Sequence, residues 1–294
     1  MTEYALPEAF VHFFDDAAVF PPGRAPLEVA LRDYIARRQT ALAAAVGPLV
    51  LPLKDLPEAR QLAADFDFTG GPIEASIVTP AGHLKDAFVA AASARPLINV
   101  VSIELKTNPL DQNWAGELLA AASTTEQCQL YVELTAEQIE SGALQLIART
   151  GVRLKYRTGG IEQVLFPTPA QVASVLAAAA EQEVPFKLTA GLHRAMRYTD
   201  PETGFTHHGF INISVATALA RSGASEATLQ SVLQQTNPAV LAELFASVSP
   251  NWRESFNSFG TCSITEPLQT LEEMGILPPG ASALAISLQK AVQS

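Results

Sequence analysis

Basic side chains recur at alternate positions of one otherwise apolar segment: Arg153, Lys155 and Arg157. Successive side chains of a β-strand point to opposite faces, so these three share one face. Lys187 and Thr189 alternate in the same way in a second segment. Amines and a guanidinium gathered in one volume are suited to binding an anion. They are also suited to Schiff-base chemistry with a carbonyl compound, if one amine loses its proton.

Side chains that can transfer protons also lie in or next to apolar segments of this kind. Glu133 and Glu104 interrupt apolar runs, where an unpaired charge is costly unless it has a function. His193 follows a glycine turn, and histidine titrates near neutral pH, so it is a candidate for proton transfer. A salt bridge of Glu133 with Lys155 or Arg153 that only fills the interior is the structural alternative. The number of cations relative to carboxylates favours a binding site for an anion or a carbonyl compound.

Eight short β-strand-like runs alternate with segments whose apolar residues have helical spacing. The expected strands are 17–20, 48–53, 75–79, 98–105, 129–134, 151–157, 185–189 and 259–264, and the expected helical segments are 26–46, 56–66, 83–94, 113–124, 136–149, 168–182, 209–248, 267–274 and 280–292. This alternation predicts parallel strands, and eight units predict a (β/α)8 TIM-type barrel. A doubly wound open sheet is the alternative, but no G-x-G-x-x-G turn occurs.

The whole chain, 1–294, is predicted to be a single barrel domain, with a helical insert at 192–256 between strands 7 and 8. Active sites of such barrels lie at the carboxyl ends of the strands, where the polar residues cluster. Asp15 and Asp16 precede the expected first strand. We expect them to cap a solvated segment, and the alternative is that one of them reaches the barrel mouth. Cys262 is expected to be a small buried residue.

Composition narrows the function classes. Hydrophobic residues make up 48% and charged residues 17% of the chain, which is typical of a globular protein. The net charge of −11 argues against nucleic acid as a partner. Apolar stretches are shorter than a membrane span, and the acidic start has no signal core, so we expect a cytoplasmic protein without membrane contact. The two cysteines are too few for a disulfide framework. The sequence leaves open whether the chain forms a homo-oligomer.

Two segments resemble a known family. Residues 155–160, Lys-Tyr-Arg-Thr-Gly-Gly, resemble the Lys-Thr-Ser-Thr-Gly segment of deoxyribose-phosphate aldolases, and residues 186–191 resemble their Val-Lys-Ala-Ser-Gly-Gly segment. Residues 131–135 are similar to the fifth strand of that family, and residues 260–263 to its eighth, which helps bind phosphate. As an order of strands, the resemblance spans roughly residues 98–264.

The resemblance implies a class I aldolase-type lyase acting on a small anionic carbonyl compound, without metal or other cofactor. Lys155 is then the nucleophile, and Lys187 is a nearby cation that lowers the pKa of Lys155. Glu133, Glu104 and His193 are candidate proton carriers. The candidate substrate-binding residues are Arg157, Thr158, Gly159, Gly160, Thr189, Gly191, Thr261 and Ser263.

The chain also departs from that family. The aspartate of the family's fourth strand is replaced by Glu104, which is shifted along the strand, and the insert 192–256 is far longer than the family's connection. A non-catalytic barrel that binds a phosphate or carboxylate metabolite is the alternative function. Metal-dependent hydrolysis is a third hypothesis, based on His193, His207 and His208, but their spacing matches no zinc signature.

Overall fold

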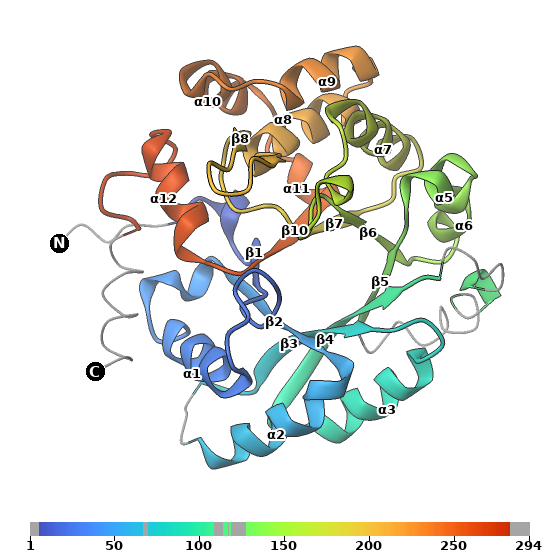
Figure 1. Cartoon of the computed structure of the whole chain (residues 1–294), viewed down its shortest axis with the longest axis vertical. Helices are drawn as coiled ribbons and strands as arrows, with labels where there is room; N and C mark the ends of the chain where they lie inside the picture. Colours follow the sequence, from blue (N-terminus) through green and yellow to red (C-terminus); the bar gives the residue numbers. More distant parts are fainter. Residues whose placement is uncertain (1–5, 67–69, 109–113, 117, 119–127, 283–294) are drawn as a thin grey trace.

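The computed structural model describes residues 6–66, 70–108, 114–116, 118 and 128–282. Eight parallel strands close into a barrel in the order β1-β10-β7-β6-β5-β4-β3-β2. In chain order they are β1 (Phe14–Asp16), β2 (Val46–Pro52), β3 (Ile73–Thr79), β4 (Ile98–Lys106), β5 (Gln129–Glu133), β6 (Arg153–Arg157), β7 (Phe186–Thr189) and β10 (Phe256–Thr261). Figure 1 shows this ring of strands inside a ring of helices. The fold is therefore a (β/α)8 TIM-type barrel, as the alternation predicts.

Helices connect the strands on the outside of the barrel. They are α1 (Leu27–Arg37), α2 (Leu56–Asp65), α3 (Leu84–Ala94), α5 (Ala136–Glu140), α6 (Ala143–Ala148), α7 (Pro169–Glu181) and α12 (Thr265–Glu273). Local sequence sets where several of them begin. Thr135 and Thr168 each accept a hydrogen bond from the backbone N–H of the glutamine three residues later, whose side chain bonds back to the threonine N–H.

The first and last strands lie closer to the N-terminus than the sequence pattern predicts. Residues 17–20 form a turn, in which Phe20 N donates to Ala17 O at 2.9 Å, and the first strand is β1 instead. Asp15 and Asp16 are therefore strand residues, each 1% exposed, and the expected solvated cap is wrong. β10 likewise begins three residues before the expected start, at Phe256. Most of the expected helices 280–292 and 113–124 lies outside the described residues, and residues 280–282 form a turn.

The segment between β7 and β10 is the expected helical insert. It contains a short antiparallel pair, β8 (Tyr198–Thr199) and β9 (Thr206–His207), followed by α8 (Phe210–Arg221), α9 (Glu226–Leu233), α10 (Pro238–Ser247) and α11 (Trp252–Ser255). Figure 1 shows α8, α9 and α10 together on one side of the barrel, with α9 and α10 outermost. Phe13, just before β1, packs on the rings of Phe210, Trp252 and Phe256, so the start of the chain is held by the insert and β10.

One stretch, Gln163–Glu181, is long and apolar enough to cross a membrane by length and composition, with a mean hydropathy of 1.2. It includes α7, whose residues Val172, Val175 and Leu176 are buried. α7 packs against α8 and α9. We therefore interpret this stretch as part of the helical layer of the barrel.

Candidate active site

Four ionisable side chains meet across the interior of the barrel. Lys187 Nζ lies 2.5 Å from Asp15 Oδ2 and 2.6 Å from Glu104 Oε1. The other oxygen of Glu104 lies 2.8 Å from Lys155 Nζ. Two serine hydroxyl groups also donate hydrogen bonds to the carboxylates, Ser258 to Asp15 at 2.8 Å and Ser76 to Glu104 at 2.6 Å. Glu104 is thus a bridge between the two lysines.

The network continues towards the carboxyl ends of the strands. Lys155 Nζ also lies 3.0 Å from Glu133 Oε2, and Glu133 Oε1 accepts a hydrogen bond from Arg157 Nε at 3.2 Å. The side chain of Lys155 is 3% exposed, that of Glu133 16% and that of Arg157 35%. Exposure therefore rises along this series, and the pair of Glu133 and Arg157 covers Lys155 on the side of the barrel mouth.

Strand register explains why these residues meet. Glu133, Lys155 and Lys187 are direct neighbours across β5, β6 and β7, so their side chains point to the same face. The alternation along each strand turns that face inward, as the sequence predicts. Glu104 and Asp15 come from β4 and β1, which are not neighbours of β7, and they reach the lysines through the interior.

Basic and acidic groups are equal in number in the network. The three cations Lys155, Lys187 and Arg157 contact three carboxylates, Asp15, Glu104 and Glu133. The expected excess of cations over carboxylates is therefore wrong, because Asp15 lies in a strand and not in a solvated cap. Without that excess, the two buried lysines create no uncompensated positive potential for an anion.

The pKa values of the lysines follow from these contacts. Burial alone would lower the pKa of Lys155, but Glu104 and Glu133 outweigh burial and raise it. Lys187 shows the same balance, since Asp15 and Glu104 raise its pKa above the ordinary value despite burial. The expectation that Lys187 lowers the pKa of Lys155 disagrees with this, because carboxylates separate and neutralise the two ammonium groups.

The carboxylates are not alike. Burial alone would raise the pKa of Glu104, but the ammonium groups of Lys155 and Lys187 hold it well below its ordinary value. The pKa of Glu133 is also lowered, by Lys155 and Arg157 against burial. For Asp15 burial dominates, and its pKa is raised even though Lys187 is adjacent.

Arg153 has a structural environment of its own. It donates to Asn257 Oδ1 at 2.9 Å and lies 3.4 Å from the hydroxyl of Tyr131. The structure describes no ion pair between Arg153 and Glu133, which instead contacts Lys155 and Arg157. The proposed internal bridge of Glu133 therefore forms with Lys155 and not with Arg153.

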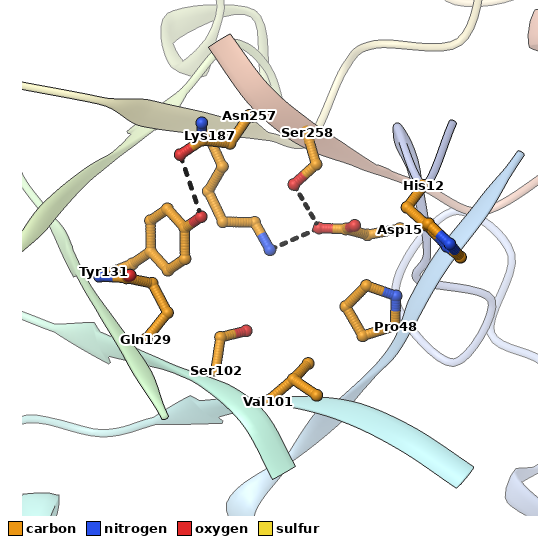
Figure 2. Close-up of a pocket in the computed structure, with 10 residues that line it drawn as sticks. All are labelled: His12, Asp15, Pro48, Val101, Ser102, Gln129, Tyr131, Lys187, Asn257 and Ser258. Atoms are coloured by element: carbon orange, nitrogen blue, oxygen red, sulfur yellow. Dashed lines mark hydrogen bonds and ion pairs between the residues drawn. The ribbon is translucent and has the colours of Figure 1, made fainter. Parts of the chain in front are cut away.

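A cavity of about 190 Å³ lies on the amino-terminal side of this network. Its ten lining residues are His12, Asp15, Pro48, Val101, Ser102, Gln129, Tyr131, Lys187, Asn257 and Ser258. Figure 2 shows the ammonium group of Lys187 at the centre of this ring, next to Asp15 and Ser258. Gln129 is the first residue of β5 and His12 precedes β1, so the cavity opens away from the carboxyl ends. Sequence reasoning did not find this cavity.

His193 lies in a separate cluster after β7. Its Nδ1 is 3.8 Å from Cys262 Sγ and 3.8 Å from Glu266 Oε2, and its ring centroid is 6.0 Å from that of His207. Burial lowers the pKa of His193 and raises that of Cys262. Among the described contacts none joins His193 to Lys155, so the structure does not bring this predicted proton carrier to the lysines.

Close packing explains why glycine occupies the positions after β6 and β7. A Cβ on Gly159 would lie 2.7 Å from Gly191 Cα, and Gly191 has a φ of +78°, so two backbones cross where side chains do not fit. Gly160 differs, because a Cβ there would meet the side chain of Leu165. Thr158 ties the two turns together by donating to Ala190 O at 2.7 Å.

The remaining predicted substrate contacts lie at the carboxyl ends of β7 and β10. Thr189 is the half-buried last residue of β7, and Arg157 is its neighbour in β6. Thr261 Oγ1 donates to Ser263 O at 2.9 Å, and Ser263 Oγ accepts the backbone N–H of Glu266 at the start of α12. Ser263 thus has a capping role.

The other histidines of the insert have backbone partners. His207 Nδ1 lies 2.8 Å from Gly191 O, and His208 Nε2 lies 2.7 Å from Pro167 O. Burial lowers the pKa of His208 to about 4. Within the described part of the chain, no group of three or more His, Cys, Asp or Glu side chains is arranged to hold a metal ion.

Comparison with known proteins adds little to this geometry. No family model and no curated protein matches the sequence. Among solved structures, the chain is similar to dihydropteroate synthase of Xanthomonas albilineans, solved with indole-2-carboxylic acid and 6-chloroguanine. The two share 10% identity over 97% of this chain and 95% of that one, with a TM-score of 0.42. At that level the likeness carries no functional argument, and the resemblance to deoxyribose-phosphate aldolases stays a hypothesis.

Proposed function

We propose that this barrel is a Schiff-base lyase in which Lys155 is the nucleophile. One observation carries the proposal: the Lys155 amine lies between two carboxylates, 2.8 Å from Glu104 and 3.0 Å from Glu133. Either carboxylate is close enough to accept the ammonium proton and return it later. Lys155, unlike Lys187, contacts Glu133, whose partner Arg157 is 35% exposed at the carboxyl end of β6. TIM-type barrels carry their active sites at the carboxyl ends of the strands.

A charge balance supports this role even though the pKa of Lys155 is raised. Condensation of the ammonium group with a carbonyl compound forms one C=N bond, releases one water molecule and leaves an iminium ion. The iminium ion carries the same positive charge as the ammonium group. Glu104 and Glu133 therefore stabilise both the resting state and the covalent intermediate, and only the transient neutral amine is costly.

Each step has a residue of this chain beside it. Glu104 or Glu133 accepts a proton from Lys155, and the free amine attacks the carbonyl carbon. The oxygen then receives a second proton from the attacking nitrogen and the first one back from the carboxylate, and it leaves as water. In a retro-aldol direction, Glu133 takes the proton of the β-hydroxyl group while the electrons of the carbon–carbon bond move into the iminium ion. An aldehyde leaves, and the enamine then takes a proton on carbon and is hydrolysed.

The proposed substrate is a small carbonyl compound that enters from the mouth. An anionic substituent would lie beside Arg157, the most exposed cation of the network at 35%. Thr189 is the neighbour of Arg157 on β7 and would contact the same substituent. Binding of an anion without chemistry is less well supported, because the lysines are already neutralised by carboxylates.

Borohydride trapping tests the proposal. The intact protein is incubated with a panel of small aldehydes and ketones, reduced with borohydride, and mapped by peptide mass spectrometry. We expect a stable adduct on Lys155 that Lys155→Met abolishes. Lys85→Met removes an exposed lysine of α3 and serves as the matched control, which should leave the adduct unchanged. No adduct on Lys155 with any member of the panel would refute the proposal.

A further inference from the structure

The mouth of the barrel carries one basic group more than the buried network. Lys106 is the last residue of β4 and the direct neighbour of Glu133 on β5, so the two side chains point to the same face. Lys106 is exposed and forms no ion pair or hydrogen bond with any described residue. It adds a fourth basic group next to three acidic ones, which leaves a formal excess of one positive charge at the mouth.

Donors of Arg157 and Thr189 stay open on the same side. Arg157 Nε binds Glu133 at 3.2 Å and Nη1 donates to Gly159 O at 3.3 Å, whereas Nη2 has no partner among the described residues. Thr189 accepts from Thr158 through its carbonyl oxygen, and in the described part of the chain its hydroxyl group is without a partner. A planar guanidinium group beside a hydroxyl group is suited to binding a carboxylate.

Gly260 keeps space open next to these donors. Ser258 points inward to Asp15, so Gly260, two residues further along β10, belongs to the same inner face. A Cβ on Gly260 would lie 3.6 Å from Ala17 Cβ and 4.0 Å from Thr189 Oγ1, so a methyl group fits there without a clash. The layer above the lysines therefore lacks a side chain beside Thr189.

A single carboxyl group sets the distance between the amine and the anion site. Lys155 Nζ lies 3.0 Å from Glu133 Oε2, and Arg157 Nε lies 3.2 Å from Glu133 Oε1. The two cationic groups are therefore bridged by the width of one carboxylate. A substrate that is bonded to Lys155 and held by Arg157 needs its anionic group close to the carbonyl carbon.

We propose that the substrates of this site are 4-hydroxy-2-oxo acids, in which the carboxylate is bonded directly to the carbonyl carbon. The inference rests on the Schiff-base proposal and names its substrate class. One carboxylate matches the excess of one positive charge, whereas a phosphate group, with about 1.5 to 2 negative charges, exceeds it. The carboxylate accepts from Arg157 and Thr189, and the charge of Lys106 favours it from the side of β4.

The reaction of such a substrate balances on the residues present. Lys155 forms an iminium ion at C2 with loss of one water molecule. The bond between C3 and C4 then breaks, its electrons move into the iminium ion, and Glu133 takes the hydroxyl proton of C4. An aldehyde leaves, the proton passes from Glu133 to C3 of the enamine, and hydrolysis by one water molecule frees a 2-oxo acid and Lys155.

Borohydride trapping with three small ketones tests the substrate class on the intact chain. Pyruvate has a carboxylate next to its carbonyl group, hydroxyacetone is neutral, and dihydroxyacetone phosphate carries a phosphate ester. The labelling rate of Lys155 is divided by that of Nα-acetyllysine in the same mixture, which removes differences in carbonyl reactivity. We expect this ratio to be at least tenfold higher for pyruvate than for either other ketone.

The outcomes separate the substrate class from the Schiff base itself. A smaller preference for pyruvate, or a preference for another ketone, overturns the substrate class while labelling of Lys155 still supports the Schiff base. No adduct with pyruvate overturns the substrate class as well. Absence of adducts on Lys155 across the whole carbonyl panel refutes both proposals.

Two variants locate the carboxylate. Lys106→Met removes an exposed charge that has no ion-pair partner among the described residues, so the chain should stay folded while its preference for pyruvate over hydroxyacetone falls at least threefold. Arg157→Met should lower that preference at least tenfold. Lys85→Met, which removes an exposed charge of α3, is the control and should change it less than twofold. A preference that survives both Lys106→Met and Arg157→Met refutes the inference.

Discussion

Replacement of Glu104 by glutamine is the most informative single perturbation of the network. Glu104 accepts hydrogen bonds from Lys187, Lys155 and Ser76 and is 1% exposed. Glutamine keeps the shape but removes the charge, which leaves three cations facing two carboxylates. Removal of one partner from a buried ion pair costs about 3–5 kcal/mol, because the other charge stays buried without compensation.

The expected loss is large enough to measure directly. A change of 1 kcal/mol shifts the melting temperature of a domain of this size class by about 2–4 °C, so Glu104→Gln should lower it by about 6–20 °C. Urea unfolding at pH 7, followed by circular dichroism, should show a lower midpoint with an unchanged slope. The matched control is Glu28→Gln, which breaks an exposed pair with Arg32. Breaking that exposed pair should cost at most about 1 kcal/mol.

A double variant separates charge balance from packing. Glu104→Gln combined with Lys155→Met leaves two intact pairs, Asp15 with Lys187 and Glu133 with Arg157. We expect it to recover at least half of the stability that the single variant loses. A loss below about 1 kcal/mol for Glu104→Gln, or a double variant less stable than the single one, would refute the charge-balance argument.

Three further predictions follow from individual contacts. The pKa of Glu104 is lowered in the folded state, so its stabilising contribution is present above about pH 4.3 and is lost as the pH falls below that value. Glu104→Gln should therefore flatten the acid limb of a profile of unfolding free energy against pH. An unchanged acid limb would contradict this prediction. Gly159→Ala should lower the free energy of unfolding in urea by about 1–3 kcal/mol, because the new Cβ would lie 2.7 Å from Gly191 Cα. Gly260→Ala should lower it less, since a Cβ there would lie 3.6 Å from its nearest neighbour. Equal losses in the two variants would refute the crossing of the two turns. Burial raises the pKa of the Cys262 thiol. In a mass-spectrometric time course at pH 7, iodoacetamide should therefore modify Cys262 more slowly than it modifies the free thiol of glutathione. Equal rates of modification would exclude the raised pKa.

Side-chain alternation made the inward face of the barrel predictable. Lys155, Lys187 and Glu133 lie in strands of ordinary length, where an apolar residue flanks every charged one. That pattern is local, so the sequence contains enough information to place these side chains inside. The barrel itself follows from the alternation of strands and helices, which is also a local signal.

The partners of the lysines were harder to predict, because they come from distant strands. Asp15 belongs to a strand of three residues, Phe14–Asp16, which is too short for a periodic signal. The sequence indicates Glu104 as a candidate, but its position between both lysines depends on how β4 faces β6 and β7 across the barrel. A useful signal in retrospect is the pair of phenylalanines that precedes Asp15, since a carboxylate directly after two large apolar residues is rarely solvated.

The placement of β1 has a consequence for synthesis on the ribosome. β1 pairs with β10, and Phe13 packs on rings that belong to the last third of the chain. At ~5–20 residues per second, about 10–50 s pass between synthesis of Asp16 and of Thr261. During that time the first strand can pair with β2 but lacks its second neighbour, β10. The phenylalanines before it have no complete core, and Lys187 emerges long after Asp15. A nascent chain of this protein should therefore need protection of its first residues, and truncation before β10 should leave an open sheet that aggregates.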